Sequence, residues 1–212
     1  MYPFFFKRAI DFILSLCALI VLSPLLLVLC IFGTLFMRGN PFFFQERPGK
    51  NEKIFRLVKF RTMDNRRNKN GDLLPDNVRL NRYGKFLRST SLDELPELIN
   101  IIKGDMSIIG PRPLLPRDVS YMNIEQKRRH TVRPGLTGLS QSSGRNSMNW
   151  DEKLSTDVEY VDNLSFFLDC KIFFMTILKV LKRENVEFDE GAEMDLKEWN
   201  ELKTRQEENK WI

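Results

Sequence analysis

The chain has 212 residues, 42% of them hydrophobic and 29% charged, so it can bury one core of ordinary domain size with little left for a second. The formal net charge is +5, but residues 184–212 carry ten acids against four bases, and the remainder is therefore about +11. This charge predicts an anionic partner: nucleic acid, anionic lipid or a phosphorylated small molecule. The three cysteines show no metal-ligand spacing and exclude a disulfide framework, as in a cytoplasmic protein.

The first predicted element is a membrane segment. Residues 12–37 contain no charged side chain, and 26 such residues exceed what a soluble helix normally shows. One straight helix of that length measures about 39 Å, against a hydrocarbon core of about 30 Å. The apolar run is too long for a cleaved signal peptide and lacks a small-residue cleavage site, so we expect it in the mature chain.

Ser23 and Pro24 interrupt this run at its middle. Pro24 has no N–H for the carbonyl of Ile20, and the Ser23 hydroxyl can bond the backbone groups so freed, so a break is expected. Lys7 and Arg8 precede the run and further basic residues follow it, which favours both ends on the cytoplasmic face. A re-entrant hairpin fits both observations; a tilted single span with a proline kink is the alternative.

A mixed region follows the membrane segment. Residues 41–45 and 53–63 are predicted to be strands, and the alternation of apolar and basic residues in the second places Lys59 on one face with Arg61. The polar residues 64–76 are predicted to be a loop. Residues 79–88 are predicted to be a helix with a basic stripe, which by itself is typical of a solvated helix face.

The stretch TSLDELPEL at 90–98 places two acids before a proline near the start of a predicted helix that ends at 103–104. Ser91 with Glu94 forms a capping-box pattern, whereas Asp93 as the cap puts Pro96 where a missing N–H costs nothing. Under either start the two acids lie at the positive end of the helix dipole, which favours ionised carboxylates and a nearby phosphate or divalent cation. The simpler interpretation is that the acids only cap the helix.

Two later segments suit phosphate binding. Residues 104–113 are predicted to form a short strand that ends in a rigid Pro-Arg-Pro turn, which fixes Arg112. Residues 128–146 are rich in Gly, Arg and hydroxyl side chains, which present backbone N–H groups and guanidinium forks to phosphate oxygens. Neither a dinucleotide-binding fingerprint nor a P-loop is present in the sequence, and His130 is expected to be structural.

The last two predicted elements are helices. Residues 166–183 are apolar but interrupted by charges, so they are expected to form an amphipathic helix in the head-group region, with a buried core helix as the alternative. The acidic residues 184–212 are expected to form an exposed helix, to which we assign no chemistry.

Together these motifs resemble the monotopic phosphoglycosyl transferases, bacterial enzymes that begin glycoconjugate assembly on a polyprenol carrier. The resemblance covers about residues 6–183 and rests on five ordered segments: Ser23-Pro24, KFRTM at 59–63, SLDELPEL at 91–98, GDMSIIGPRP at 104–113 and VRPGLTG at 132–138. One departure is Leu139, which stands where the family pattern has tryptophan. The short chain is most similar to the members that act in bacterial protein N-glycosylation.

The resemblance implies a mixed α/β (α+β) fold that is mostly helical, with a small sheet, a re-entrant membrane hairpin and amphipathic interfacial helices. It implies a membrane anchor at 1–38 and a catalytic domain at 39–183, and the acidic C-terminal tail at 184–212 lies outside the resemblance. The expected location is the cytoplasmic face of the bacterial inner membrane.

The resemblance also implies a two-step reaction. Asp93 is expected to attack the β-phosphate of a UDP-sugar, release UMP, and hold the phosphosugar until polyprenyl (undecaprenyl) phosphate takes it. Asp93 and Glu94 are expected to hold Mg²⁺, with a role of Glu94 in proton transfer left open. Phosphate contacts are expected from Lys59, Arg88 and Arg112, and contacts to the nucleotide or the lipid phosphate from Arg133, Gln141 and Arg145.

The expected donor is UDP-N,N'-diacetylbacillosamine; the alternative is another UDP-sugar, used to initiate O-antigen, capsule or exopolysaccharide. Membrane lipids and downstream glycosyltransferases are the expected partners. A non-catalytic membrane-anchored binding protein would also explain the anchor and the charge, but not the Asp-Glu pair. A nucleic-acid partner is not expected, because no zinc spacing, aromatic-basic RNA motif or helix-turn-helix pattern is present in the sequence.

Overall fold

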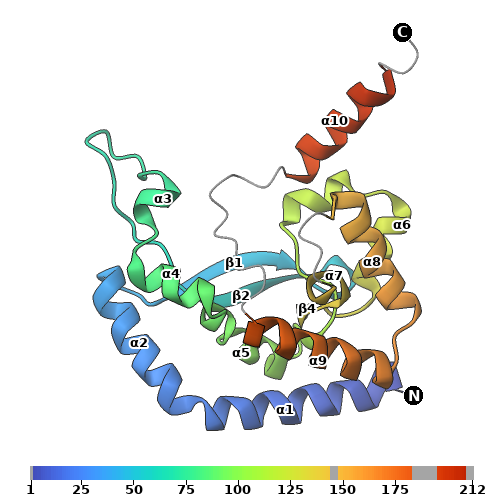
Figure 1. The fold of residues 1–212 in the computed structure, drawn as a ribbon, viewed down its shortest axis with the longest axis horizontal. Coiled ribbons are helices and arrows are strands. Elements are labelled where there is room, and N and C mark those ends of the chain that lie inside the picture. The colour runs from blue at the N-terminus through green and yellow to red at the C-terminus, as the bar shows by residue number, and fades with distance from the viewer. Residues whose placement is uncertain (1, 144–147, 183–194, 209–212) are drawn as a thin grey trace.

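The computed structural model describes residues 2–143, 148–182 and 195–208, with two long helices along one side and the other elements packed against them (Figure 1). The helices are α1 (Lys7–Val21), α2 (Ser23–Met37), α3 (Asp76–Arg79), α4 (Arg82–Ser89), α5 (Glu97–Lys103), α6 (Ile124–Lys127), α7 (Leu139–Ser142), α8 (Trp150–Asp162), α9 (Phe166–Lys182) and α10 (Leu196–Glu208). The strands are β1 (Phe42–Pro48), β2 (Ile54–Phe60), β3 (Ser107–Ile109) and β4 (Gly135–Thr137). A mostly helical fold with two small two-stranded sheets confirms the predicted fold class.

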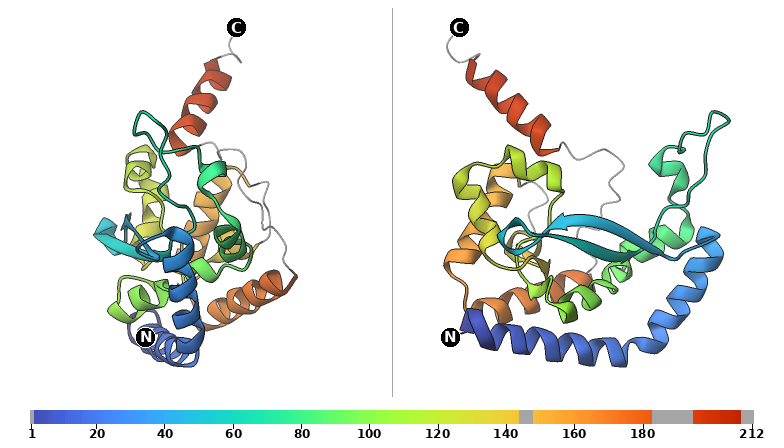
Figure 2. Two further views of the ribbon diagram at one scale, coloured as in Figure 1. Left: turned by 90° about the vertical axis from the view of Figure 1, so that its left-hand side faces the viewer. Right: turned by 180° about the vertical axis from the view of Figure 1, so that it is seen from behind.

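The apolar N-terminal segment is broken as the sequence predicts. Helices α1 and α2 have 15 residues each, or about 22 Å at 1.5 Å per residue, and meet at Leu22 with a bend of 65° (Figure 2). The Ser23 hydroxyl donates to the carbonyl of Ile20 at 2.7 Å, which satisfies the acceptor that Pro24 cannot reach. Among the described residues no single helix is long and apolar enough to cross a membrane; α1 and α2 reach that length and apolar composition only together, as a bent pair of the kind seen in broken spans and re-entrant loops.

The basic residues that precede the apolar run bind the protein itself. The Lys7 ammonium lies 2.7 Å from Asp169 Oδ2 on α9, and both side chains are buried. Arg8 donates to the carbonyls of Ile101 and Ile102 at 2.5 and 2.7 Å, which caps the C-terminal end of α5. These two charges therefore fix α1 to the rest of the fold, and the predicted cytoplasmic position of both ends of the run stays a prediction.

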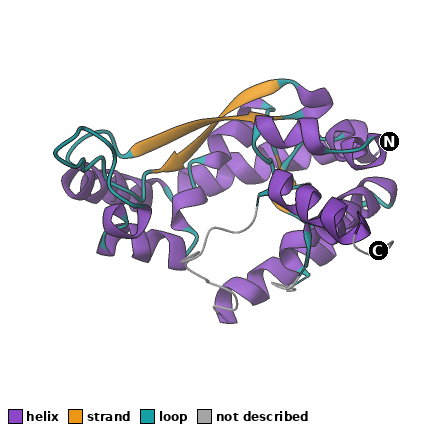
Figure 3. Cartoon of the chain, turned by 90° about the horizontal axis from the view of Figure 1, so that it is seen from above, coloured by secondary structure: helices purple, strands orange, loops and turns teal. Residues whose placement is uncertain are grey.

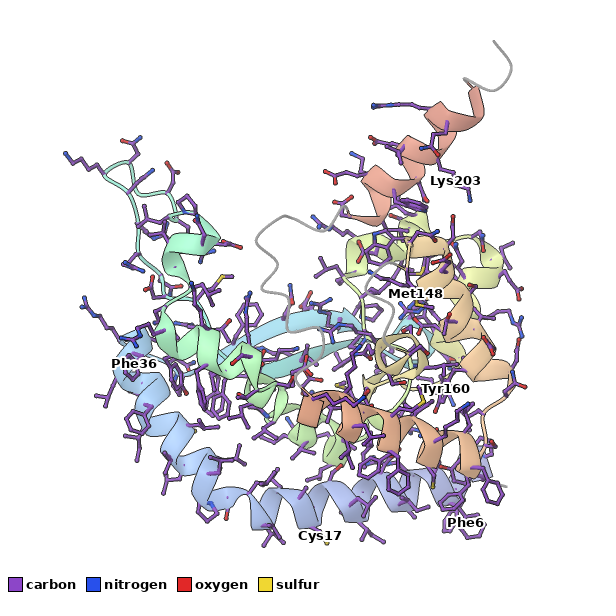
Figure 4. All side chains as sticks on the ribbon, viewed as in Figure 1. Phe6, Cys17, Phe36, Met148, Tyr160 and Lys203 are labelled. Carbon is purple, nitrogen blue, oxygen red and sulfur yellow. The ribbon has the colours of Figure 1, made fainter. Side chains whose placement is uncertain are left out.

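Helices α1, α2 and α9 share an exposed apolar surface. Figure 4 shows Phe6, Cys17 and Phe36 along the outer edge that α1 and α2 form. On α9 the side chain of Phe167 is 83% exposed, while Ile172 is fully buried. Helix α9 is therefore amphipathic, with its apolar outer face uncovered, and the many exposed apolar side chains of α1, α2 and α9 are typical of contact with a membrane.

The two sheets lie inside this arc of helices. Strands β1 and β2 pair antiparallel from Phe42 opposite Phe60 to Pro48 opposite Ile54, and this hairpin runs along one edge of the molecule (Figure 3). Strands β3 and β4 pair in parallel, and Gly135 approaches Gly110 so closely that a Cβ would lie 2.1 Å from its nitrogen. The predicted strands at 41–45 and 53–63 exist with shifted ends.

The predicted helix at 79–88 is two helices. Leu80 leaves the helical region after α3, and Asn81 begins α4 by accepting from Gly84 N at 2.9 Å. A Cβ on Gly84 would lie 1.9 Å from the Thr62 carbonyl oxygen, so only glycine lets α4 approach the chain beyond β2 this closely. This contact brings Arg88 Nε within 3.2 Å of Thr62 Oγ1 and orients α4 at the site described below.

Helix α10 confirms a helix in the C-terminal tail, but its first turn is not exposed. Leu196 is 1% exposed, and Trp199 Nε1 donates to Asp151 Oδ2 on α8 at 3.3 Å. The expectation of a wholly exposed tail helix is therefore wrong for this turn, since two apolar side chains dock it on the domain. The segment 183–194 lies outside the described residues.

Candidate active site

The Asp-Glu pair lies in a tight turn and not in the first turn of an α-helix. Ser91 has φ +53° in the left-handed region, residues 92–94 form a single 3₁₀ turn, and α5 begins at Glu97 after Pro96. The Ser91 side chain caps nothing, and α5 has no side-chain cap. Both predicted helix starts are wrong. Helix α5 begins at Glu97, four residues after Asp93, and Pro96 is its N-cap residue. The interpretation of the acids as mere helix caps fails with them.

Both acids face an open pocket of about 690 Å³ between β1, β2, α4 and the Pro-Arg-Pro turn. Six basic and three acidic side chains line it, so the pocket favours an anionic ligand. The pocket brings together the five site residues predicted from separate sequence motifs, namely Lys59, Arg88, Asp93, Glu94 and Arg112. It also contains the basic residues Arg47, Arg61 and Arg79, which sequence analysis did not assign to the site.

Glu94 is held by two cations from distant parts of the chain. The Lys59 ammonium lies 2.7 Å from Glu94 Oε1, and Arg112 Nη1 lies 3.4 Å from the same oxygen. Burial alone would raise the pKa of the Glu94 carboxyl, but Arg112 and Lys59 hold that pKa below its usual range. Glu94 is therefore ionised at neutral pH, and its second oxygen, Oε2, is left for other ligands.

Glu97 is a carboxylate of the site that sequence analysis missed. It is 3% exposed at the start of α5, and its Oε1 lies 3.0 Å from the Lys59 ammonium. Burial raises the pKa of Glu97 to about 7, although Lys59 opposes the shift. The sequence did contain a signal for this residue: Glu97 lies next to the apolar Leu98 and Ile101 on the predicted helix. A charge on an apolar helix face is expected to be paired.

Asp93 forms no comparable ion pair with any residue that the structure describes. Burial and the neighbouring Glu94 raise the pKa of Asp93 to about 6, and the positive charges of Lys59 and Arg88 act in the opposite direction. The sequence-based reason for its ionisation, a helix start, does not apply. Asp93 is instead ionised at neutral pH because the basic pocket limits the effect of burial, which leaves a carboxylate with little stabilisation of its charge.

The residues present fit a divalent cation of the Mg²⁺ type. The described residues contain no group of three or more His, Cys, Asp or Glu side chains that could hold a metal by themselves. Asp93 and Oε2 of Glu94 offer carboxylate oxygens at the pocket, and Mg²⁺ commonly takes one or two carboxylates, with waters and substrate phosphates completing its shell. These two residues would hold the ion only together with a phosphorylated substrate.

Two of the three predicted contacts to the nucleotide or lipid phosphate, Arg133 and Gln141, do not line this pocket. Arg133 Nε donates to the Gly104 carbonyl at 2.8 Å, and the side chain lines a separate cavity of about 280 Å³ near Lys103. Gln141 is on α7, and its carbonyl accepts from Lys179 at 2.7 Å. Arg145 lies outside the described residues.

Buried groups position the Pro-Arg-Pro turn. Arg129 is 2% exposed, and its Nη2 donates to the Arg112 carbonyl at 2.5 Å and to Asp157 Oδ2 at 2.7 Å. Asp157 Oδ1 accepts from Ser140 at 2.8 Å, so the segment that departs from the family pattern takes part in this network. His130, which is predicted to be structural, is buried and does not line the catalytic pocket, and burial and Arg129 lower its pKa to about 4.

The sequence pattern of the bacterial sugar transferase family matches residues 2–183. The chain belongs to this family. The sugar transferase EpsL of Bacillus subtilis is 51% identical over 150 residues, which are 70% of this chain and 74% of EpsL. The exopolysaccharide production protein ExoY of Sinorhizobium fredii is 37% identical over 192 residues, 81% of this chain and 83% of ExoY.

A third relative is the UDP-glucose:undecaprenyl-phosphate glucose-1-phosphate transferase of Klebsiella pneumoniae, 39% identical over 184 residues. Those residues are 82% of this chain but only 40% of that enzyme, so the likeness concerns one part of a longer protein. The expected special likeness to the N-glycosylation members is not supported, because the names of these relatives refer to exopolysaccharide and to glucose 1-phosphate transfer.

Proposed function

We propose that this protein transfers a sugar 1-phosphate from a UDP-sugar to undecaprenyl phosphate and releases UMP. The observation that carries the proposal is the position of Asp93 and Glu94 beside Lys59, Arg88 and Arg112 in one open, basic pocket. Membership of the bacterial sugar transferase family and the activity for which the Klebsiella pneumoniae relative is named support the same chemistry.

In the first step an oxygen of Asp93 attacks the β-phosphorus of the UDP-sugar. The new P–O bond forms as the bond from that phosphorus to the oxygen bridging to the α-phosphate breaks, so UMP leaves and an acyl phosphate remains on Asp93. The ionised carboxylate needs no general base. The basic side chains of the pocket, which include Arg88, neutralise charge on the diphosphate and on the departing UMP.

Lys59 and Arg112 carry out this stabilisation from positions fixed by Glu94. Their shared contact with Oε1 of Glu94 holds both cations at the pocket before substrate binds, which limits the reorganisation needed during the reaction. Mg²⁺ held by Asp93 and Glu94 would supply further positive charge to the diphosphate. Lys59 also forms an ion pair with Glu97, so its ammonium keeps this partner if its contact with Glu94 is replaced by one with the substrate.

For the sugar and the pathway, the names of the relatives favour the alternative to N-glycosylation. The names of ExoY and the Klebsiella pneumoniae enzyme favour UDP-glucose or a similar UDP-hexose and the initiation of exopolysaccharide or capsule. UDP-N,N'-diacetylbacillosamine, the donor expected from the sequence, is therefore the substrate with which UDP-hexoses should be compared in an assay. A glycosyltransferase that extends a lipid-linked diphosphosugar would consume the product.

The bent helix pair serves this reaction as a re-entrant anchor. One substrate is soluble and the other lies in the bilayer with its phosphate at the surface, so the pocket has to lie at the interface. Fixation of α1 by Lys7 and Arg8 and the apolar outer faces of α1, α2 and α9 support placement on the cytoplasmic face of the inner membrane. Cysteines introduced near Met1 and near Asn51 should be labelled from the same side; labelling from opposite sides would show a span.

The function is tested by UMP release from a panel of UDP-sugars. The protein in detergent, with undecaprenyl phosphate and Mg²⁺, should release UMP from at least one UDP-hexose, and Asp93→Asn should release none. Absence of UMP with every donor would indicate a non-catalytic binding protein. Preference for UDP-N,N'-diacetylbacillosamine over every UDP-hexose would instead support a role in N-glycosylation.

A further inference from the structure

A second cavity of about 680 Å³ lies where α2 ends, next to the catalytic pocket. Its lining includes Phe36, Arg38, Arg61 and Arg66. Arg61 and Asn65 line both cavities, so the two spaces meet at these side chains. A group bound in the second cavity therefore has a short route to Asp93.

This cavity is positively charged in a way that internal pairing does not cancel. Arg66 Nε lies 2.8 Å from Asp64 Oδ2, so that acid is already neutralised. Arg38 and Arg61 form no ion pair with any residue in the described parts of the chain. Two guanidinium groups are left to bind an anion, and their forked donors match the oxygens of a phosphate.

Arg38 also occupies an unfavourable backbone conformation. It ends α2 with φ +51° and ψ +44°, a left-handed position that glycine adopts more easily than a residue with a side chain. Glycine follows only one residue later, at Gly39. Backbone strain of this kind is concentrated at functional sites, and here it places a cation at the rim of the cavity.

The surroundings of the cavity are apolar on one side. Arg38 is the first charged residue after the uncharged run, so it marks the point where the chain leaves the apolar segment. Phe32, Leu35 and Phe36 on the last turns of α2 are 46%, 66% and 50% exposed, and Figure 4 shows Phe36 at the outer edge of this helix. The basic cavity thus continues into an exposed apolar helix face, as a ligand with an anionic head and a lipid tail requires.

We propose that this second cavity binds the phosphate of the lipid acceptor, with the isoprenoid tail along the exposed face of α2, and that Arg38 is a binding residue for that phosphate. The inference rests on the proposed function. The other basic cavity, near Lys103, is a weaker candidate, because it shares no lining residue with the catalytic pocket.

The second chemical step then proceeds from this position. An oxygen of the acceptor phosphate dianion attacks the phosphorus bound to Asp93, and the bond from that phosphorus to the carboxylate oxygen breaks. The electron pair returns to the Asp93 carboxylate, and the product is a lipid diphosphosugar with two negative charges. Atoms and charge balance without an added proton, and Arg61 lies at the junction where the attacking oxygen passes.

The test separates the two half-reactions. In detergent, exchange of labelled UMP into the UDP-sugar without acceptor reports the first step, and the KM for undecaprenyl phosphate reports the second. Arg38→Gly removes the guanidinium and also relieves the backbone strain, so the variant should fold. We expect it to raise the acceptor KM about ten- to a hundredfold, as for loss of a charge-assisted phosphate contact, and to leave the exchange rate unchanged.

Two further variants and one binding assay complete the experiment. Arg38→Lys should keep part of the acceptor affinity, and Lys103→Ala, in the cavity remote from the active site, should change neither quantity. An unchanged acceptor KM in Arg38→Gly, or an equal fall in exchange, would overturn the proposal. So would a loss of binding to phosphatidylglycerol vesicles without a change in acceptor KM, which would mark a general head-group site. If the unmodified protein shows no exchange, the proposed function itself fails.

Discussion

Replacement of Asp93 by asparagine should stabilise the protein while it abolishes sugar-phosphate transfer. Burial and Glu94 raise the pKa of the Asp93 carboxyl from 3.8 to about 6, so its ionised form is less stable in the folded protein than in the unfolded chain. Each pKa unit corresponds to about 1.36 kcal/mol, and the ionised carboxylate therefore lowers the free energy of unfolding by about 3 kcal/mol at pH 7.5. The neutral amide of the asparagine side chain avoids this cost.

The sign of the effect fixes its pH dependence. Below pH 3.8 Asp93 is protonated in both the folded and the unfolded state, so it costs nothing; the cost grows as the pH rises from 3.8 to about 6 and is constant above that. The advantage of Asp93→Asn should therefore be about 3 kcal/mol at pH 7.5 and shrink to about 1 kcal/mol at pH 4.5. The same titration predicts that UMP exchange by the unmodified protein falls as the pH drops below about 6.

Thermal unfolding followed by tryptophan fluorescence measures this difference. For a chain of this size 1 kcal/mol moves the Tm by about 2–4 °C, so Asp93→Asn should unfold about 6–12 °C higher at pH 7.5. Asp72→Asn, in the exposed loop at 64–76, is the matched control and should not change the Tm. A gain for Asp93→Asn that is absent, or equal at pH 7.5 and pH 4.5, would refute the reasoning from burial.

Three further substitutions test the supports of the site and the anchor. Lys59→Met leaves Glu94 without its nearest cation and should lower the free energy of unfolding by about 2 kcal/mol, seen as a lower Tm at pH 7.5; an unchanged Tm would show that the pairing is not stabilising. Pro24→Ala restores an N–H donor and should straighten the α1–α2 bend. Cysteines that flank the hairpin should then be labelled from opposite sides of the membrane in part of the population. Labelling from the same side in the whole population would mean that Pro24 does not set the bend. Asp169→Asn leaves the buried Lys7 with only the more distant Asp11, at 4.0 Å, as a counter-charge and should cost about 2–3 kcal/mol of unfolding free energy, a result contradicted if thermal unfolding is unaffected.

The features that the sequence predicts well are those with a local cause. Pro24 removes a donor and Ser23 supplies a hydroxyl within one turn, so the break in the apolar run follows from neighbouring residues alone. The alternation over the first half of β2 reflects a buried face on which Phe55 and Leu57 lie, and it ends at Phe60, which is buried on the opposite face. These elements needed no knowledge of the rest of the fold.

The parts that sequence reasoning missed depend on tertiary contacts. The approach of β2 to α5 pairs Lys59 with Glu97, and no pattern within either element specifies that partner. The left-handed turn at Ser91 overrides a capping-box pattern that is favourable when judged locally. Arg133 was placed at the phosphate site because its segment is rich in Gly and Arg, but the fold directs its side chain to Gly104 and a separate cavity.

The covalent phosphosugar on Asp93 is the central claim, and mass spectrometry of the trapped protein tests it most directly. The protein is incubated with its UDP-sugar in the absence of lipid acceptor, quenched, and digested for peptide mapping. The account predicts a mass increase of one sugar phosphate on Asp93, absent in Asp93→Asn and lost when undecaprenyl phosphate is added. Stoichiometric UMP release with the sugar phosphate on another residue, or with no adduct on the chain, would contradict it.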